Sequence, residues 1–445
     1  MYGPPRRRRP DAARGSNWAR CRARRPPPAR SSACGAVTAT SSAASEYRSW
    51  RAKRAAIRSI ASSRRRCATR GRPTNCAGRC ASGGWSASLS ASDPPRAVVF
   101  GCAGPALSDA ERRFFAEADP LGFILFGRNV ETPAQVAALV AALRDVVGRA
   151  DAPVLIDQEG GRVRRLKPPH WRAFPPAATI GALASSDADA AARAAFLAGR
   201  LIAADLAPLG VSVDCAPVCD VAEEGTHDAI GDRAFARDPA LVARLARAFA
   251  VGLADGAVAP VMKHMPGQGR ACVDSHAELP VVHADWPALE RVDFRPFAEN
   301  ADIPWGMTAH VVYSAIDPQR PATCSPDVIA RAIRGAIGFA GPLLTDDLSM
   351  NALKGGVGER AAAALAAGCD VALHCNGRMD EMQAVAAAVP RLADAALSRI
   401  AQARRRPLTN RDRALDSARQ PRSIRAMEAQ FAGLIGAEIA RSGQA

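Results

Sequence analysis

Short runs of consecutive apolar residues alternate along this chain with longer, alanine-rich stretches in which apolar residues recur at helical spacing. The apolar runs predict eight strands, at Val98–Gly101, Gly122–Phe126, Val154–Asp157, Val211–Cys215, Val261–His264, Gly306–Val311, Leu343–Asp346 and Val371–His374. The helical stretches between them include Pro133–Val147, Asp187–Asp205, Pro239–Asp255, Ala284–Asn300, Pro326–Ile337 and Gly358–Ala367. Continuous apolar strands separated by amphipathic helices indicate a parallel sheet that is covered by helices.

The number of these strand–helix units favours a closed barrel over an open sheet. Eight units over roughly 300 residues match a (β/α)8 barrel. No Gly-x-Gly-x-x-Gly sequence follows the first strand, which weakens the alternative of a dinucleotide-binding fold. We therefore expect an α/β protein with a TIM-like (β/α)8 barrel over residues 96–400. Residues 401–445 are expected to form a basic tail, in which Ile424–Ile439 has the spacing of a short helix.

Positive charge is concentrated at the two ends of the chain. The formal net charge is +16, and residues 1–95 alone hold 21 Lys and Arg against three acidic residues. Residues 96–400 hold 29 Lys and Arg against 36 acidic residues, so the expected barrel is mildly acidic. A body of this charge is a poor polyanion binder, and we expect no specific nucleic-acid partner.

Residues 1–95 are predicted to be a disordered, Arg-rich leader. They consist mainly of Arg, Ala, Ser, Pro and Gly without a sustained period, so they offer too little apolar surface to offset the entropy of ordering. Three interpretations are open: a basic arm, an organelle-targeting peptide, or a stretch outside the natural product. The abrupt change of composition at Arg96 favours the third.

Composition and cysteine usage point to a protein of a reducing compartment. Hydrophobic residues make up 48% of the chain, enough for a sizeable core, yet no run of about 18 apolar residues predicts a membrane span. Seven of the twelve cysteines are scattered through the expected barrel and its apolar contexts, which is typical of buried free thiols. Cys76 and Cys80 lack a second Cys/His pair nearby, so we expect neither a metal site nor a cofactor.

Polar residues follow four of the expected strands. The four clusters are Asp157-Gln158-Glu159-Gly160-Gly161-Arg162, Ile230-Gly231-Asp232-Arg233-Ala234-Phe235, Lys263-His264-Met265-Pro266-Gly267 with Asp274-Ser275-His276 beyond it, and Thr345-Asp346-Asp347-Leu348-Ser349-Met350. Active sites of (β/α)8 barrels lie at the carboxyl ends of the strands. These clusters therefore mark one candidate active site.

Asp346 is the candidate nucleophile. It stands at a strand tip, where its carboxylate can point into the mouth of the barrel. The alternative role is a helix N-cap, but only one of the two adjacent residues Asp346 and Asp347 is needed for that. An ionised carboxylate in this place can attack an electrophilic sugar carbon and form a covalent glycosyl intermediate.

Asp274 and His276 form a candidate acid–base pair. In a loop their side chains can fold together, so that the carboxylate orients the imidazole and stabilises its protonated form. His276 could instead be an isolated polar loop residue. Lys263 beside His264 would put a cation against any metal, so a metal site is the less attractive interpretation.

The remaining charged residues have the chemistry of a sugar-binding site. Asp157, Arg165, Arg233 and Lys263 can provide the directed, charge-assisted hydrogen bonds that a hydroxyl-rich ligand requires. The alternative is a structural network of salt bridges at the rim of the barrel.

The same stretches carry a family resemblance. Residues 96–400 resemble the bacterial β-N-acetylhexosaminidases of glycoside hydrolase family 3, of the single-domain, cytosolic type used in cell-wall recycling. The stretches that match in order and spacing are Asp157-Gln-Glu-Gly-Gly-Arg-Val, Gly231-Asp-Arg-Ala-Phe, Lys263-His-Met-Pro-Gly, Asp274-Ser-His-Ala-Glu-Leu-Pro and Asp346-Asp-Leu-Ser-Met. Two residues depart from the pattern: Gln268 stands where the family usually has histidine, and Met265 where phenylalanine is common. We expect altered loop packing from Gln268 rather than lost chemistry.

The resemblance implies a role for each candidate residue. Asp346 would be the nucleophile, His276 the acid/base and Asp274 its partner. The residues expected to hold an N-acetylglucosamine ring are Asp157, Arg165, Arg233, Lys263 and His264. The implied protein is a cytoplasmic monomer whose substrates are N-acetylglucosaminyl-anhydro-muropeptides.

Three functions remain to be compared. The leading one is a retaining exo-glycosidase that removes terminal, non-reducing β-N-acetylglucosamine from peptidoglycan-derived muropeptides. The second is a glycoside phosphorylase on the same barrel, because a histidine acid/base does not repel phosphate as a carboxylate would. The third is a nucleic-acid-binding protein that acts through the basic leader.

Overall fold

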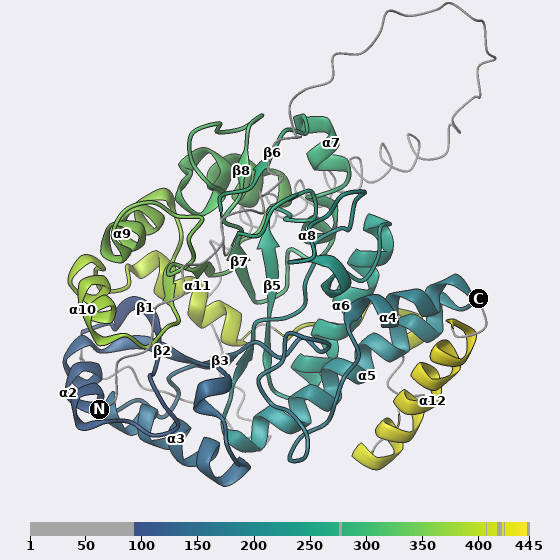
Figure 1. Ribbon diagram of the computed structural model, residues 1–445, viewed down its shortest axis with the longest axis horizontal. Coiled ribbons are helices and arrows are strands. Elements are labelled where there is room, and N and C mark those ends of the chain that lie inside the picture. Colours follow the sequence, from purple (N-terminus) through teal and green to yellow (C-terminus); the bar gives the residue numbers. More distant parts are fainter. Residues whose placement is uncertain (1–92, 276–277, 406, 416–420, 422, 443–445) are drawn as a thin grey trace, which may run out of the picture. The chain divides into compact units, whose positions relative to one another are not determined.

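The eight expected strands form a closed parallel barrel (Figure 1). The computed structural model describes residues 93–442 except 276–277, 406, 416–420 and 422, so the leader lies almost wholly outside the described residues. Around the barrel the strands follow chain order: β1 (Arg96–Gly101), β2 (Pro120–Leu125), β3 (Val154–Ile156), β4 (Val213–Asp214), β5 (Ala259–Met265), β7 (Trp305–Thr308), β9 (Leu343–Asp347) and β10 (Val371–His374), which pairs with β1. The TIM-like fold predicted from the sequence is confirmed.

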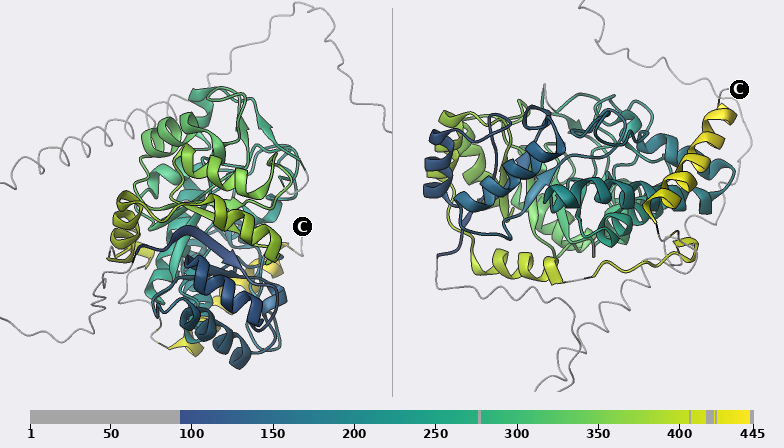
Figure 2. Two further views of the ribbon diagram at one scale, coloured as in Figure 1. Left: turned by 90° about the vertical axis from the view of Figure 1, so that its left-hand side faces the viewer. Right: turned by 90° about the horizontal axis from the view of Figure 1, so that it is seen from below.

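Helices follow the strands and surround the barrel, as the apolar spacing predicts (Figures 1 and 2). The longer ones are α2 (Asp109–Ala118), α3 (Pro133–Val146), α5 (Ala188–Leu206), α6 (Pro239–Asp255), α9 (Val357–Ala367) and α10 (Met379–Ala388). Asp187 caps α5 by accepting hydrogen bonds from the amides of Asp189 and Ala190, at 2.9 and 2.8 Å. No helix in the described part of the chain is both long and apolar enough to cross a membrane.

Two helical segments differ from the sequence expectation. The stretch Ala284–Asn300 divides into α7 (Trp286–Arg291) and α8 (Arg295–Glu299). Pro296 has no amide hydrogen, and its ring would clash with the carbonyl four residues earlier, so one continuous helix cannot run through it. The segment Val328–Ile337, expected to be an α-helix, has the wider π-helical hydrogen-bond pattern.

Two short strands lie outside the barrel sheet, in the loops that follow β5 and β7. β6 (Val281–Val282) and β8 (Val312–Tyr313) pair in parallel as a separate two-stranded sheet. They follow β5 and β7, so the loops beyond these two strands are tied to each other. The small sheet joins two loops that leave the carboxyl ends of the barrel strands.

Alternate residues of each strand fill the inside of the barrel. Leu155 of β3, Val261 of β5 and Leu344 of β9 belong to one buried apolar cluster. Two residues further along the chain from these three stand Asp157, directly after β3, Lys263 in β5 and Asp346 in β9. Side chains two residues apart in a strand face the same side, so these charged groups also point into the barrel. They lie above the apolar layer, at the mouth of the barrel.

The segments after β10 pack at two places, the starts of the barrel strands and the outer helices. Ala396 and Ile400 of α11 (Asp394–Arg405) pack into the same interior cluster, near the starts of the strands. The helix expected from Ile424 is α12 (Ile424–Ser442), which packs against α4 (Ala177–Ala182) and α5 (Figures 1 and 2). Phe431 of α12 lies 5.9 Å from Phe174, measured between ring centroids.

Candidate active site

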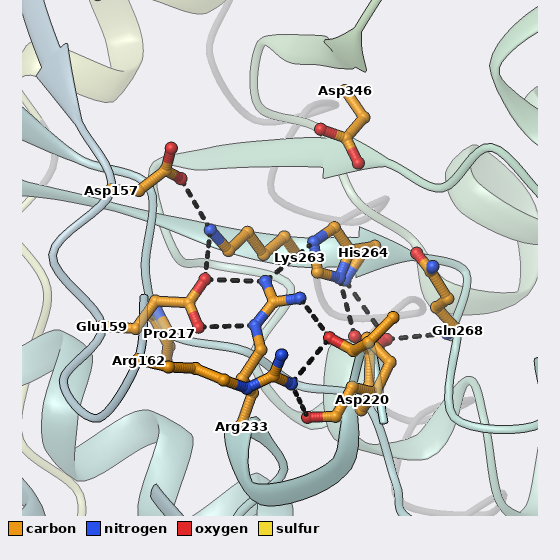
Figure 3. A network of polar contacts seen from close by, with 12 residues as sticks. Asp157, Glu159, Arg162, Pro217, Asp220, Arg233, Lys263, His264, Gln268 and Asp346 are labelled. Carbon is orange, nitrogen blue, oxygen red and sulfur yellow. Dashed lines mark hydrogen bonds and ion pairs between the residues drawn. The ribbon is translucent and has the colours of Figure 1, made fainter. Parts of the chain in front are cut away.

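A buried lysine joins the ends of β3 and β5 (Figure 3). The Lys263 side chain is 2% exposed, and its Nζ lies 2.9 Å from Asp157 Oδ1. The other oxygen of Asp157 accepts a hydrogen bond from Arg165 Nη2 at 2.9 Å. Burial alone would raise the pKa of Asp157, but the ammonium of Lys263 and the guanidinium of Arg165 outweigh it and hold the pKa well below its usual range. Asp157 is therefore an anion with fixed orientation.

Glu159 extends this network to Arg233. Arg233 donates from Nε and Nη2 to the two oxygens of Glu159, both at 2.8 Å, and Lys263 Nζ lies 2.6 Å from Glu159 Oε1. Burial would raise the pKa of Glu159, yet the two cations lower it to about 2. Anions and cations alternate in the order Arg165, Asp157, Lys263, Glu159, Arg233, and we call these five residues the ionic network.

The imidazole of His264 lies next to this network. Its Nδ1 is 2.7 Å from Asp220 Oδ2, and its Nε2 is 3.5 Å from Arg233 Nη2. Because the carboxylate of Asp220 can only accept, Nδ1 carries a hydrogen and donates it to Asp220. Asp220 is fully buried and also accepts from the His264 amide at 3.2 Å, so the ring is held in one orientation.

The two adjacent aspartates at the end of β9 have different surroundings. The carboxylate of Asp347 holds the turn that follows β9: it accepts from Ser349 N at 3.0 Å, Ser349 Oγ at 2.6 Å and Cys375 N at 3.2 Å. Asp346 accepts a hydrogen bond from the Asp347 amide at 2.8 Å, and within the described residues no cation lies within 4.0 Å of it. In the part of the chain that the structure describes, no helix begins directly after β9, since the next helix is α9 and its N-cap is Gly356, so neither aspartate is the helix N-cap considered from the sequence.

The Asp346 carboxylate faces Lys263 and His264 from the side opposite to Glu159 and Arg233 (Figure 3). Burial would raise the pKa of Asp346, but the positive fields of His264, His310 and Lys263 and the Asp347 amide lower it below its ordinary value. An ionised, half-buried carboxylate with free lone pairs at the barrel mouth has the properties that a nucleophile requires.

The expected acid–base pair is placed only in part. Asp274 lies half-buried in the loop after β5, whereas His276 lies outside the described residues. The contact expected between the two side chains therefore stays a prediction.

The structure brings six of the eight expected residues together: Asp157, Arg165, Arg233, Lys263, His264 and Asp346. Sequence reasoning did not select Glu159, Asp220 or His310. Glu159 follows Asp157 by two positions at a strand end, which is a usable signal. His310 follows β7; its Nε2 donates to the backbone carbonyl of Asp347 at 3.0 Å, and its Nδ1 lies 2.7 Å from Thr323 Oγ1. Within the described residues, no group of three or more His, Cys, Asp or Glu side chains could hold a metal ion.

Comparison with known proteins decides the family. The model of the glycosyl hydrolase family 3 N-terminal domain matches residues 100–409. The chain belongs to glycosyl hydrolase family 3. It is a glycoside hydrolase, and the resemblance to the family-3 β-N-acetylhexosaminidases is confirmed.

Relatives in this family match over most of the barrel. A beta-hexosaminidase of Methylococcus capsulatus is 41% identical over 282 residues, which cover 62% of this chain and 82% of the relative. A beta-hexosaminidase of Alkalilimnicola ehrlichii is 40% identical over 283 residues, covering 63% and 80%. The crystal structure of NagZ from Neisseria gonorrhoeae in complex with N-trifluoroacetyl-D-glucosamine has a TM-score of 0.68 and 32% identity, covering 77% of this chain and 99% of that one.

Proposed function

We propose that this family-3 enzyme is a retaining exo-β-N-acetylglucosaminidase. The observation that carries the proposal is the state of Asp346: an ionised carboxylate at the barrel mouth, facing a fixed wall of charged hydrogen-bonding groups. The identity of the sugar is supported by the relatives, which are named beta-hexosaminidases, and by NagZ, solved with a glucosamine derivative.

In the proposed reaction Asp346 attacks the anomeric carbon of a terminal, non-reducing residue. The bond from that carbon to the leaving oxygen breaks, and His276 gives its proton to the leaving oxygen, with Asp274 orienting the imidazole. His276 then takes a proton from water, whose oxygen displaces Asp346 from the anomeric carbon. Two displacements at one carbon restore its configuration, so the product keeps the β-anomeric form.

The ionic network is proposed to hold the sugar ring. Asp157, Arg165, Lys263 and Arg233 are fixed by their ion pairs, with Glu159 linking the last two, and His264 beside them is fixed by Asp220, so the groups that meet a ligand keep one direction. The salt-bridge role considered from the sequence and the binding role are therefore compatible.

The proposed substrates are N-acetylglucosaminyl-anhydro-muropeptides, and the proposed setting is cell-wall recycling by a monomer in the cytoplasm. The likeness to the beta-hexosaminidases and to NagZ supports this substrate class.

The decisive experiment traps the intermediate. The enzyme is mixed with an activated phenyl N-acetyl-β-glucosaminide, quenched, and its mass measured before and after digestion. We expect one N-acetylglucosaminyl group on Asp346 and none in the Asp346→Ala variant. An adduct on another residue, or release of the α-anomer, would refute the mechanism. Repeating turnover with and without phosphate separates hydrolysis from phosphorolysis, because only a phosphorylase forms the sugar phosphate.

A further inference from the structure

Gln268, one of the two residues that depart from the family pattern, lies between Asp220, which orients His264, and the loop that carries Asp274. It is 3% exposed. Its backbone amide donates to Asp220 Oδ1 at 2.7 Å, and its side-chain Nε2 donates to Ser275 Oγ at 3.1 Å. Figure 3 shows Gln268 on the far side of Asp220 from Arg233. One residue thus contacts both parts of the candidate site.

The backbone of Gln268 is linked to His264 through the carboxylate of Asp220, which contacts both residues. Asp220 accepts from Gln268 N with Oδ1 and from His264 Nδ1, 2.7 Å away, with Oδ2. A buried carboxylate that accepts from two fixed donors holds both of them in place. The position of Gln268 is therefore set by the same group that orients His264.

The side chain of Gln268 holds Ser275, the neighbour of Asp274. Ser275 is 2% exposed, and its carbonyl accepts a hydrogen bond from the Ala352 amide at 3.2 Å, in the loop after β9. The Gln268 amide and the Ala352 amide thus hold Ser275 from two sides. Fixing Ser275 restricts the backbone on which Asp274 stands.

The amide of Gln268 carries a cost that an apolar side chain would not. Its Oε1 is buried and has no hydrogen-bond partner among the described residues. An unpaired buried acceptor destabilises a fold by about 1–3 kcal/mol. A leucine of similar size would avoid this cost but could not donate to Ser275, so fold stability alone does not account for the amide.

We infer that Gln268 is a positioning residue for the proposed acid–base step: through its hydrogen bond to Ser275 it fixes Asp274 relative to His264 and the ionic network. The inference rests on the proposed function, in which Asp274 orients the acid/base. Loss of the bond should weaken proton donation to the leaving group and leave attack by Asp346 unchanged.

The test compares Q268L with two other variants. In Q268L, the ratio of kcat/KM for an activated phenyl glycoside to kcat/KM for an alkyl glycoside should rise at least about tenfold, because a good leaving group departs without protonation. S275A removes the same bond from the other partner and should reproduce the change, and the double variant should add nothing further. Q268H restores a donor at this position and should keep the wild-type ratio.

Arg270 provides the matched control. It ties the same segment to Asp293 at 2.8 Å and to Glu223 at 3.0 Å without contacting Ser275. R270Q should lower the thermal midpoint and leave the leaving-group ratio at the wild-type value. An equal change of ratio in R270Q would overturn the inference, because general loosening of the segment would then suffice. An unchanged ratio in both Q268L and S275A would overturn it as well.

Hydrogen–deuterium exchange separates this inference from the proposed function. In Q268L, amides of the peptide that contains Ser275 should exchange faster than in the wild type, while amides of β5 keep their rate. Faster exchange with no hydrolysis of any N-acetylglucosaminide by the wild type would leave the positioning role in place and refute the proposed function. Unchanged exchange would refute the positioning role whatever the activity.

Discussion

Replacing Asp346 should mainly reduce turnover, whereas replacing the adjacent Asp347 should mainly reduce the stability of the fold. Asp346→Ala removes a carboxylate that accepts one hydrogen bond, from the Asp347 amide. One intramolecular hydrogen bond contributes about 1 kcal/mol, so the free energy of unfolding should fall by no more than about that amount. If Asp346 is the nucleophile, turnover should fall by at least about 10³-fold, which is a barrier increase of about 4 kcal/mol.

Asp347→Ala is the matched control. Its carboxylate accepts three hydrogen bonds, from Ser349 N, Ser349 Oγ and Cys375 N. At about 1 kcal/mol each, their loss should lower the free energy of unfolding by about 3 kcal/mol. Turnover, measured where this variant is still folded, should stay within about tenfold of the wild type.

Urea unfolding and initial rates on a chromogenic N-acetylglucosaminide measure the two effects separately. The reasoning fails if Asp346→Ala keeps activity within about tenfold of the wild type, a barrier change of only about 1.4 kcal/mol. It also fails if Asp346→Ala is destabilised as strongly as Asp347→Ala, because Asp346 would then be a structural residue.

Three further predictions use other parts of the chain. His276→Ala should slow hydrolysis of substrates with poor leaving groups far more than that of activated phenyl glycosides, and equal losses on both would indicate a binding role instead. Burial would raise the pKa of Glu159, but Arg233 and Lys263 lower it to about 2. Ionised Glu159 therefore stabilises the fold above the ordinary pKa of 4.5, and this stability is lost as the pH falls toward 2. Urea titrations at several pH values should show a shallower loss of stability between pH 4.5 and about pH 2, the window bounded by these two values, in Glu159→Gln than in the wild type. A chain beginning near Asp93 should keep the thermal midpoint and the hydrolysis rate of the full chain, since all eight barrel strands lie beyond it, and a lower midpoint would show that residues 1–92 contribute to the fold.

The sequence predicts the barrel well because each strand is a continuous apolar run. A run such as Leu343–Asp346 also ends in its functional residue, so the strand end and the site residue are found by the same pattern. The break at Pro296 was available from the chain as well, since proline interrupts a helix on stereochemical grounds. Strands, strand ends and helix breaks depend on residues that are neighbours in the sequence, and they could therefore be predicted.

The pairing of charges is not local and could not be predicted in the same way. That Lys263 contacts both Asp157 and Glu159 depends on how far β3 and β5 are staggered around the barrel, with β4 between them. Asp220 lies six residues beyond β4, where no strand period shows which way its side chain points. Its role beside His264 becomes visible only when the loops are placed in three dimensions.

The inward-facing residues of the barrel strands end in Asp157, Lys263 and Asp346. We expect these residues and the loop that carries Asp274 to differ in their resistance to denaturant. These residues stand at or directly beyond the ends of barrel strands, and their backbone can move far only if the barrel itself opens. Asp274 stands in a loop whose supports are single hydrogen bonds and ion pairs. Low concentrations of urea should therefore abolish hydrolysis of alkyl glycosides before the barrel unfolds, while Asp157, Lys263 and Asp346 keep their places until global unfolding.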